Sequence, residues 1–179
     1  NLTLPEGMDK ITVRDVLTMT NGMAQMPDML GDLIAHYFTT PLAYEPGTHF
    51  AYNSTGSCML GAIILKRSGQ NLKEYLTPRL FEPIGIDPDT FQWRQFQELG
   101  IDGEPGTFAT TEDNLRLMKL YADGGVWEGE RILSADYVKR ATTNQNDSAT
   151  EAINNPPALD NFVGYGYQIW MCRPKGVYR

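Results

Sequence analysis

Apolar residues recur at helical spacing through most of this sequence, and the pattern predicts about six helices. The expected helices lie within residues 12–20, 27–38, 53–67, 71–83, 110–123 and 134–141. Three of them begin with pairs that have capping-box spacing, in which a side chain and a backbone amide exchange hydrogen bonds. These pairs are Thr12 with Asp15, Asn71 with Glu74, and Thr110 with Asp113.

The helix expected over 53–67 is apolar nearly all the way round, which predicts a central, buried element. Either Asn53 or Ser54 can cap its first turn, because both side chains offer an acceptor oxygen. Pro78 is expected to kink or split the helix that follows, since proline has no backbone N–H to donate. In the helix after Thr110, the expected core stripe consists of Leu115, Leu117, Met118, Leu120 and Tyr121.

The remaining segments lack helical periodicity. Residues 86–109 are rich in proline and glycine and are interpreted as a long loop, with a short strand or turn near residues 91–93. Residues 142–160 are interpreted as a mobile loop, and residues 163–172 as one strand. A single strand leaves backbone groups unpaired. We therefore expect this strand to join a sheet that the chain lacks, or to self-associate with a second copy.

Composition narrows the classes of function. The net charge of -7 leaves little basic surface to neutralise phosphates, which argues against nucleic-acid binding. No apolar stretch approaches the roughly 18 residues of a membrane span, and no signal peptide is visible, so the compartment stays open. Cys58 and Cys172 lack Cys-x-x-Cys spacing, and His36 and His49 stand alone. We therefore expect no metal ion and no cofactor.

One short run of residues contains the candidate catalytic and substrate-binding side chains. In residues 46–56 a Pro-Gly turn leads to Tyr52 at the start of an apolar helix. This run resembles the tyrosine motif of the β-lactamase-like serine hydrolases, which include class C β-lactamases, D-alanyl-D-alanine peptidases and related esterases. Residues 11–23, 81–86, 106–120 and 165–170 resemble further segments of that family, in the family's order.

The resemblance implies a mainly α fold: the helical subdomain of the β-lactamase/transpeptidase-like fold. Residues 1–160 would form a helical part, and residues 161–179 a strand belonging to the sheet of an absent α/β part. The family's Ser-x-x-Lys nucleophile motif would precede this segment and a Lys/His-Thr/Ser-Gly-type strand would follow it. The chain contains neither and begins at Asn1 without an initiator methionine. It is therefore expected to be a fragment.

By the same resemblance, Tyr52 would take the proton of the serine nucleophile and later activate water or protonate the leaving group. The family often has Tyr-x-Asn here, with the amide facing the substrate. This sequence has Ser54 at the third position and Asn53 one position earlier. Both are candidate substrate-binding residues. The alternatives are that Tyr52 is a core aromatic residue and that Ser54 is only a helix cap.

These observations predict a fragment of a serine hydrolase that acts on ester, amide or β-lactam bonds through an acyl-enzyme. The fragment would supply Tyr52, bind a small-molecule or peptide substrate within the intact protein, and be inactive alone. One alternative is a non-catalytic peptide- or glycan-binding module on the same fold. Another is an unrelated all-helical interaction protein, in which the Tyr52 hydroxyl would be buried.

Overall fold

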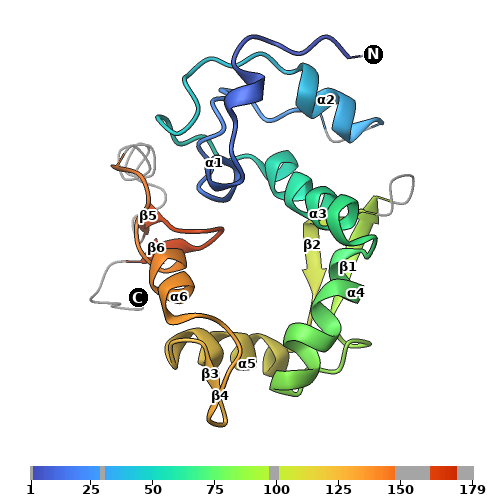
Figure 1. Cartoon of the computed structure of the whole chain (residues 1–179), viewed down its shortest axis with the longest axis vertical. Helices are drawn as coiled ribbons and strands as arrows, with labels where there is room; N and C mark the ends of the chain where they lie inside the picture. Colours follow the sequence, from blue (N-terminus) through green and yellow to red (C-terminus); the bar gives the residue numbers. More distant parts are fainter. Residues whose placement is uncertain (1, 29–30, 97–100, 148–161, 173–179) are drawn as a thin grey trace. The chain divides into compact units, whose positions relative to one another are not determined.

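The computed structural model describes residues 2–28, 31–96, 101–147 and 162–172 (Figure 1). The chain divides into two compact units. The first comprises residues 1–57 and 140–179, and the second comprises residues 58–139. Helix α3, Ser54–Ser68, carries the chain from the first unit into the second.

The first unit begins with a 3₁₀ turn, Met8–Lys10, and two short helices, α1 (Val13–Leu17) and α2 (Leu33–Thr39). The expected capping box is confirmed: the Thr12 N–H donates to the Asp15 carboxylate over 2.8 Å, and the Asp15 N–H donates to the Thr12 hydroxyl over 3.3 Å. The second helix begins later than its apolar pattern predicted. Asp32 caps it by accepting from the Ala35 N–H, and residues 29–30 lie outside the described part.

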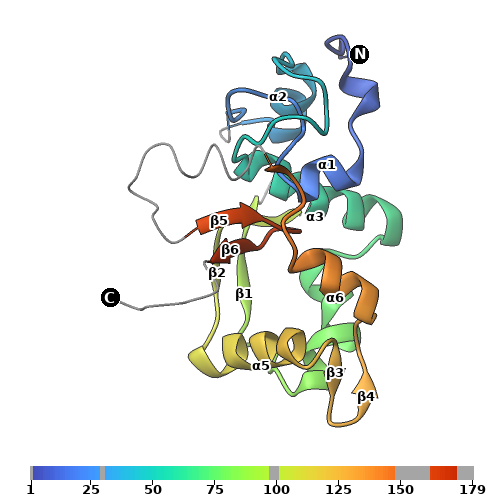
Figure 2. The same ribbon diagram turned by 90° about the vertical axis from the view of Figure 1, so that its left-hand side faces the viewer.

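The C-terminal part of this unit differs from the single strand that was expected. Strand β5 (Phe162–Tyr165) pairs antiparallel with β6 (Trp170–Cys172), and the chain turns between them (Figure 2). The prediction of an unpaired strand is therefore wrong, because a turn divides the apolar run and its two halves satisfy each other. That this hairpin joins the sheet of an absent α/β part stays a prediction, and so does self-association through it. Residues 148–161, most of the expected mobile loop, lie outside the described residues.

The second unit contains the rest of α3 and α4 (Leu72–Leu76), followed by a π-helical turn, Thr77–Phe81, and a 3₁₀ turn, Glu82–Ile84. Asn71 and Glu74 form the expected capping box. The helix is split beside Pro78, as expected: α4 ends at Leu76 and the π-helical turn that contains Pro78 begins at Thr77. The prediction that α3 is buried all round holds for Cys58 and Met59 but not for Ile63, which is 37% exposed.

The long loop expected over residues 86–109 is wrong, whereas the short strand expected near residues 91–93 is present as the beginning of a longer strand. Strands β1 (Gln92–Phe96) and β2 (Ile101–Phe108) form an antiparallel pair with an irregularity between Trp93 and Gln95 (Figure 2). Strand β2 was not predicted because it contains proline and glycine, which are uncommon in strands and weaken the alternating pattern. Each strand of this two-stranded sheet is an edge strand, with one side that has no strand beside it among the described residues. A proline, which has no N–H to donate, is tolerated in such a strand.

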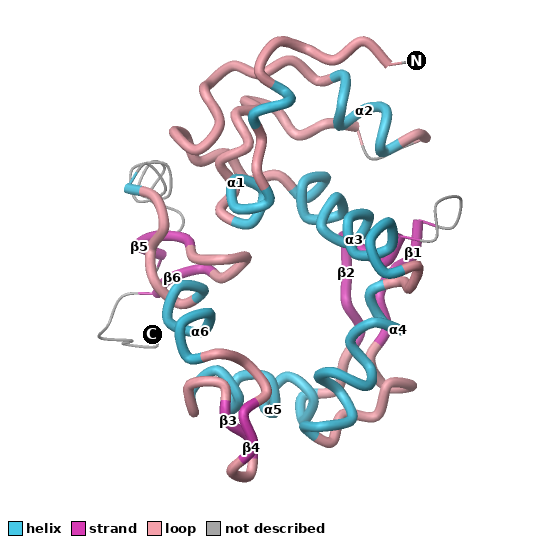
Figure 3. The backbone as a smooth tube through the Cα atoms, viewed as in Figure 1, coloured by secondary structure: helices cyan, strands magenta, loops and turns pink. Residues whose placement is uncertain are grey.

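Helix α5 (Thr111–Ala122) precedes a short hairpin of β3 (Val126–Trp127) and β4 (Glu130–Arg131), and α6 (Ala135–Ala141) follows, as Figure 3 shows. The unit's core is a cluster of buried apolar residues: Phe81, Ile84, Ile86, Phe91 and Leu120. Two members of the expected α5 stripe are outside this core, because Leu115 is 55% and Met118 is 66% exposed in this unit.

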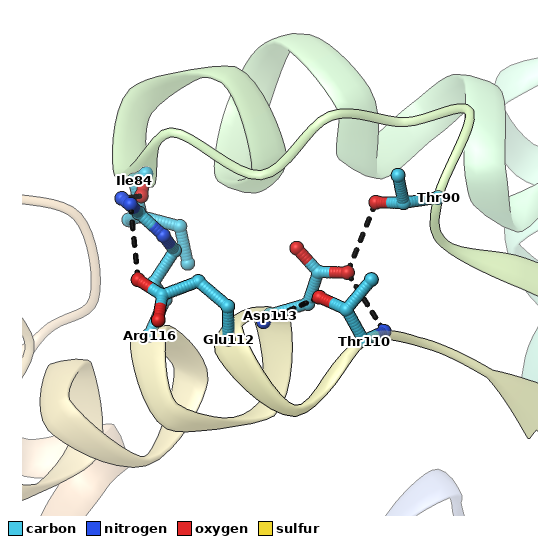
Figure 4. Close-up of polar contacts among 6 residues, drawn as sticks. All are labelled: Ile84, Thr90, Thr110, Glu112, Asp113 and Arg116. Atoms are coloured by element: carbon cyan, nitrogen blue, oxygen red, sulfur yellow. Dashed lines mark hydrogen bonds and ion pairs between the residues drawn. The ribbon is translucent and has the colours of Figure 1, made fainter.

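The first turn of α5 is joined to the preceding segments by polar contacts (Figure 4). The Asp113 carboxylate accepts from the Thr110 N–H over 3.0 Å and from the Thr90 hydroxyl over 2.9 Å. Hydrogen bonding with Thr110, the Thr90 hydroxyl and the charge of Arg116 together lower the pKa of Asp113. Arg116 donates to the Ile84 carbonyl over 3.0 Å and pairs with Glu112. Asp113 thus has the capping role that its spacing predicted.

The described residues contain neither a membrane-spanning helix nor a metal-binding cluster. None of the helices there combines the length and the hydrophobicity that crossing a membrane requires. The same residues hold no group of three or more His, Cys, Asp or Glu side chains arranged to bind a metal ion.

Candidate active site

The segment that carries Tyr52 is fixed against the residues that follow α1. The Gly22 carbonyl accepts from the N–H groups of Ala43 and Tyr44, over 2.8 and 3.0 Å, and the Gly47 N–H donates to the Thr20 carbonyl over 2.7 Å. Gly22 has a φ of +85°, and a Cβ there would lie 2.5 Å from the Tyr44 carbonyl oxygen. Only glycine allows the two segments to approach this closely.

The backbone on either side of Tyr52 is held by one residue, Met19. The Ala51 N–H donates to the Met19 carbonyl over 2.9 Å, and the Asn53 N–H donates to the Met19 sulfur over 3.3 Å. Met19 itself is buried and has a φ of 58°, an uncommon conformation for a residue with a side chain. The backbone of Tyr52 is therefore held in place on both sides, while the residue stays 45% exposed.

Tyr52 belongs to an aromatic cluster that we define as Phe50, Tyr52, Tyr165 and Trp170. The Tyr52 and Trp170 rings stack with centroids 5.5 Å apart and an angle of 21° between planes. Trp170 also presents edge contacts to Phe50 at 5.9 Å and to Tyr165 at 4.9 Å. The β5–β6 hairpin thus places one indole ring at the centre of the cluster, against the exposed phenol.

The two substrate-binding candidates have different environments. Asn53 is 1% exposed, its side-chain oxygen accepts from the Gly56 N–H over 2.8 Å, and its amide nitrogen contacts the Met23 sulfur at 3.4 Å. Asn53 therefore caps α3. Ser54 is the first residue of the helix and is half-buried. Within the described ranges, neither the Ser54 hydroxyl nor the Tyr52 hydroxyl has a hydrogen-bond partner.

Other candidate groups in this unit are arranged differently. Tyr37 is 3% exposed and accepts from the Asn21 amide over 3.4 Å, and its burial raises the pKa of the phenol. A buried phenol with a raised pKa stays protonated at neutral pH, so it is not available to accept a proton. His49 is exposed and stacks on Tyr44 with ring centroids 4.2 Å apart. Among these residues, Tyr52 alone combines a fixed backbone, an exposed side chain and a place just before the beginning of a long helix.

Comparison with known proteins identifies the family. The family described as "Beta-lactamase" matches residues 3–178, nearly the whole chain. This chain belongs to the β-lactamase family. The family resemblance inferred from the motifs is thereby confirmed, and with it the β-lactamase/transpeptidase-like fold. That the chain is the helical subdomain of this fold, without its α/β part, stays a prediction.

Individual relatives of this β-lactamase family chain include peptidase and esterase homologues. It is 24% identical over 153 residues to an Escherichia coli O157:H7 protein named "Putative D-alanyl-D-alanine carboxypeptidase", covering 62% of this chain and 35% of the relative. It is 34% identical over 59 residues to the lovastatin esterase of Penicillium rubens, covering 33% of this chain and 14% of the relative.

Among solved structures, the octameric penicillin-binding protein homologue from Pyrococcus abyssi matches with a TM-score of 0.62 and 21% identity. The match covers 94% of this chain and 48% of that one. At this level of identity the likeness shows the fold. The chain spans about a third of the first curated relative and about half of this structural neighbour.

Sequence reasoning singled out Tyr52 but missed the residues around it. Trp170 lies in the aromatic run that was expected to be a strand, and nothing local in that run indicates which tyrosine it contacts. Met19 and Gln168 were missed for another reason: their left-handed φ angles, 58° and 59°, occur at residue types that carry no signal for that conformation.

Proposed function

We propose that this chain supplies the catalytic tyrosine of a serine hydrolase, with Tyr52 as the group that accepts the proton of the serine nucleophile. The observation that carries the proposal is the exposed Tyr52 side chain, stacked on Trp170 and flanked by two amides that Met19 holds in place. A fixed position matters because proton transfer requires the base to lie within hydrogen-bond reach of the nucleophile.

Within this proposal, Ser54 is the substrate-binding residue and Asn53 supports the site by capping α3. The Ser54 hydroxyl is unpartnered within the described residues and lies two positions after Tyr52. Asn53 has its side-chain oxygen and its amide nitrogen engaged inside the protein. Its contribution to substrate binding is therefore indirect, through the first turn of α3.

The proposed reaction is hydrolysis of an amide or ester through an acyl-enzyme. The serine and lysine would come from a Ser-x-x-Lys motif that this sequence does not contain. A cationic lysine beside a phenol favours the phenolate and so makes the tyrosine a better proton acceptor. The carboxypeptidase relative aligns over more of the chain than the esterase does, which favours a D-alanyl peptide as the first substrate to test.

The test uses the intact protein that contains this sequence. Tyr52→Phe is expected to lower kcat on a D-alanyl-D-alanine peptide by about 10²- to 10⁴-fold, the usual contribution of a general base. Tyr44→Phe is the matched control, since Tyr44 is exposed to a similar degree (42%) in the same loop and makes its ring contact with His49. The melting temperatures of both variants should equal that of the parent.

Two results would contradict the proposal. One is full activity of Tyr52→Phe in the intact protein. The other is Tyr52-dependent hydrolysis of an activated ester by the 179-residue chain alone, because that chain would then hold a nucleophile of its own. Peptide or glycan binding without turnover, in a protein that lacks Ser-x-x-Lys, would instead support a binding module on the same fold.

A further inference from the structure

The turn between β5 and β6 contains a residue in an unusual conformation. Gln168 has a φ of 59°, a left-handed value that disfavours residues with a side chain. In the described part of the chain, Met19 and Glu128 are the other non-glycine residues with positive φ. Such a conformation persists when surrounding contacts favour it over the alternatives.

Those contacts are made by the backbone N–H of Gln168 and by the nitrogen and the oxygen of its side-chain amide. The Gln168 N–H donates to the Leu17 carbonyl over 3.0 Å. Its side-chain nitrogen donates to the carbonyls of Val16 and Leu17, over 3.3 and 3.1 Å. Its side-chain oxygen accepts from the Ser57 hydroxyl over 2.6 Å. The last carbonyls of a helix lack partners within the helix, so Gln168 satisfies the end of α1.

These bonds join the three segments that meet around Tyr52. Ser57 lies in the first turn of α3, which begins two residues after Tyr52. Trp170, the first residue of β6, follows Gln168 by two positions and stacks on Tyr52. The amide of Gln168 therefore connects the end of α1, the beginning of α3 and the hairpin that carries Trp170.

We propose that Gln168 is a positioning residue that holds the Trp170 ring against Tyr52. It acts through Trp170 and does not itself touch the reacting atoms. The stacked indole restricts the rotamers open to the Tyr52 side chain and so fixes the direction of its hydroxyl. Support of this kind matters because a catalytic group displaced by about 1 Å can lose about 10²-fold in rate. The catalytic meaning of this contact rests on the proposed function, whereas the contact itself does not.

The contact can be measured by ¹⁹F NMR on the chain labelled with 5-fluorotryptophan. Single Trp→Phe variants assign the three signals, from Trp93, Trp127 and Trp170. Tyr52→Leu removes the stacked ring and gives the chemical shift of Trp170 without its partner. Gln168→Gly tolerates the left-handed φ but removes the side-chain bonds, so backbone strain does not confound the result.

We expect Gln168→Gly to move the Trp170 signal toward its position in Tyr52→Leu and to leave the Trp127 signal unchanged. Glu128→Gly is the matched control: it makes the same kind of substitution at an exposed residue with a φ of 47°, and it should not move the Trp170 signal. Ser57→Ala, a milder variant that removes one bond, should move that signal in the same direction by a smaller amount.

The proposal is overturned if Gln168→Gly and Ser57→Ala both leave the Trp170 signal at its wild-type position while Tyr52→Leu shifts it. It is also overturned if Tyr52→Leu produces no shift, since the rings would then not be stacked. In the intact hydrolase, Gln168→Gly should lower kcat about 10- to 100-fold with little change in KM. Full activity of Tyr52→Phe with an intact NMR result would remove the proposed function and leave the positioning contact standing.

Discussion

Neighbouring residues Asn53 and Ser54 are both candidates for substrate binding, and their different burial predicts that replacing them affects stability to different extents. Asn53→Ala removes the cap of α3 and leaves the buried Gly56 N–H without its acceptor. Loss of an N-cap costs about 1 kcal/mol, and an unsatisfied buried donor costs about 1–3 kcal/mol. These two figures describe overlapping effects of the same lost hydrogen bond. We therefore expect a decrease of about 2 kcal/mol in the free energy of unfolding.

Ser54→Ala should change that free energy by less than about 0.5 kcal/mol, because the hydroxyl has no partner in the described structure and alanine favours the helix. Asn71→Ala provides a matched cap control. Asn71 caps α4 in the same way but is less buried than Asn53, so its loss should cost about 1 kcal/mol.

The assay is urea unfolding followed by circular dichroism at 222 nm. With a denaturant slope of about 2 kcal/mol per molar, Asn53→Ala should lower the midpoint by about 1 M and Ser54→Ala by less than about 0.25 M. Equal midpoints for these two variants would refute the reasoning, because the buried Asn53 cap would then contribute no more to stability than the unpartnered Ser54 hydroxyl. In the intact protein, Ser54→Ala should raise KM for the D-alanyl-D-alanine peptide, because the proposed function makes Ser54 a substrate-binding residue.

Three further predictions concern stability. Leu120→Ala should destabilise the chain by about 3 kcal/mol, because Leu120 is fully buried. Leu115→Ala on the same helix should cost under about 1 kcal/mol, because Leu115 is 55% exposed. Urea unfolding of both variants compares the two losses of stability. The pKa of Asp113 is lowered in the folded protein, so its carboxylate stabilises the fold at pH values above the pKa of an unfolded aspartate, near 4. This stabilisation is lost as the pH falls through the lower pKa of the folded state. Asp113→Asn should therefore weaken the dependence of melting temperature on pH below about pH 4, and unchanged melting curves would contradict this. Gly166→Ala should cost about 1–3 kcal/mol, because a Cβ there would lie 1.9 Å from the Ala141 carbonyl oxygen, and an unaltered melting temperature would argue against that close approach.

The sequence by itself determined the features that depend on residues close together in the chain. The capping boxes of α1, α4 and α5 were predicted correctly, because each is a contact between residues three apart. The interruption of the helix beside Pro78 was predicted from the missing N–H of proline. Family membership also followed from sequence, since the motifs keep their order along the chain.

Tertiary structure decided which of those residues meet across long separations. The pairing of β1 with β2 depends on a partner strand, and the proline and glycine in β2 weaken its local pattern. The hydrophobic pattern placed Leu115 and Leu120 in one stripe, yet only Leu120 has neighbours that bury it. The contact of Tyr52 with Trp170 spans more than a hundred residues. No local rule encodes such a contact, because it forms only when the hairpin and the start of α3 are brought together by the fold.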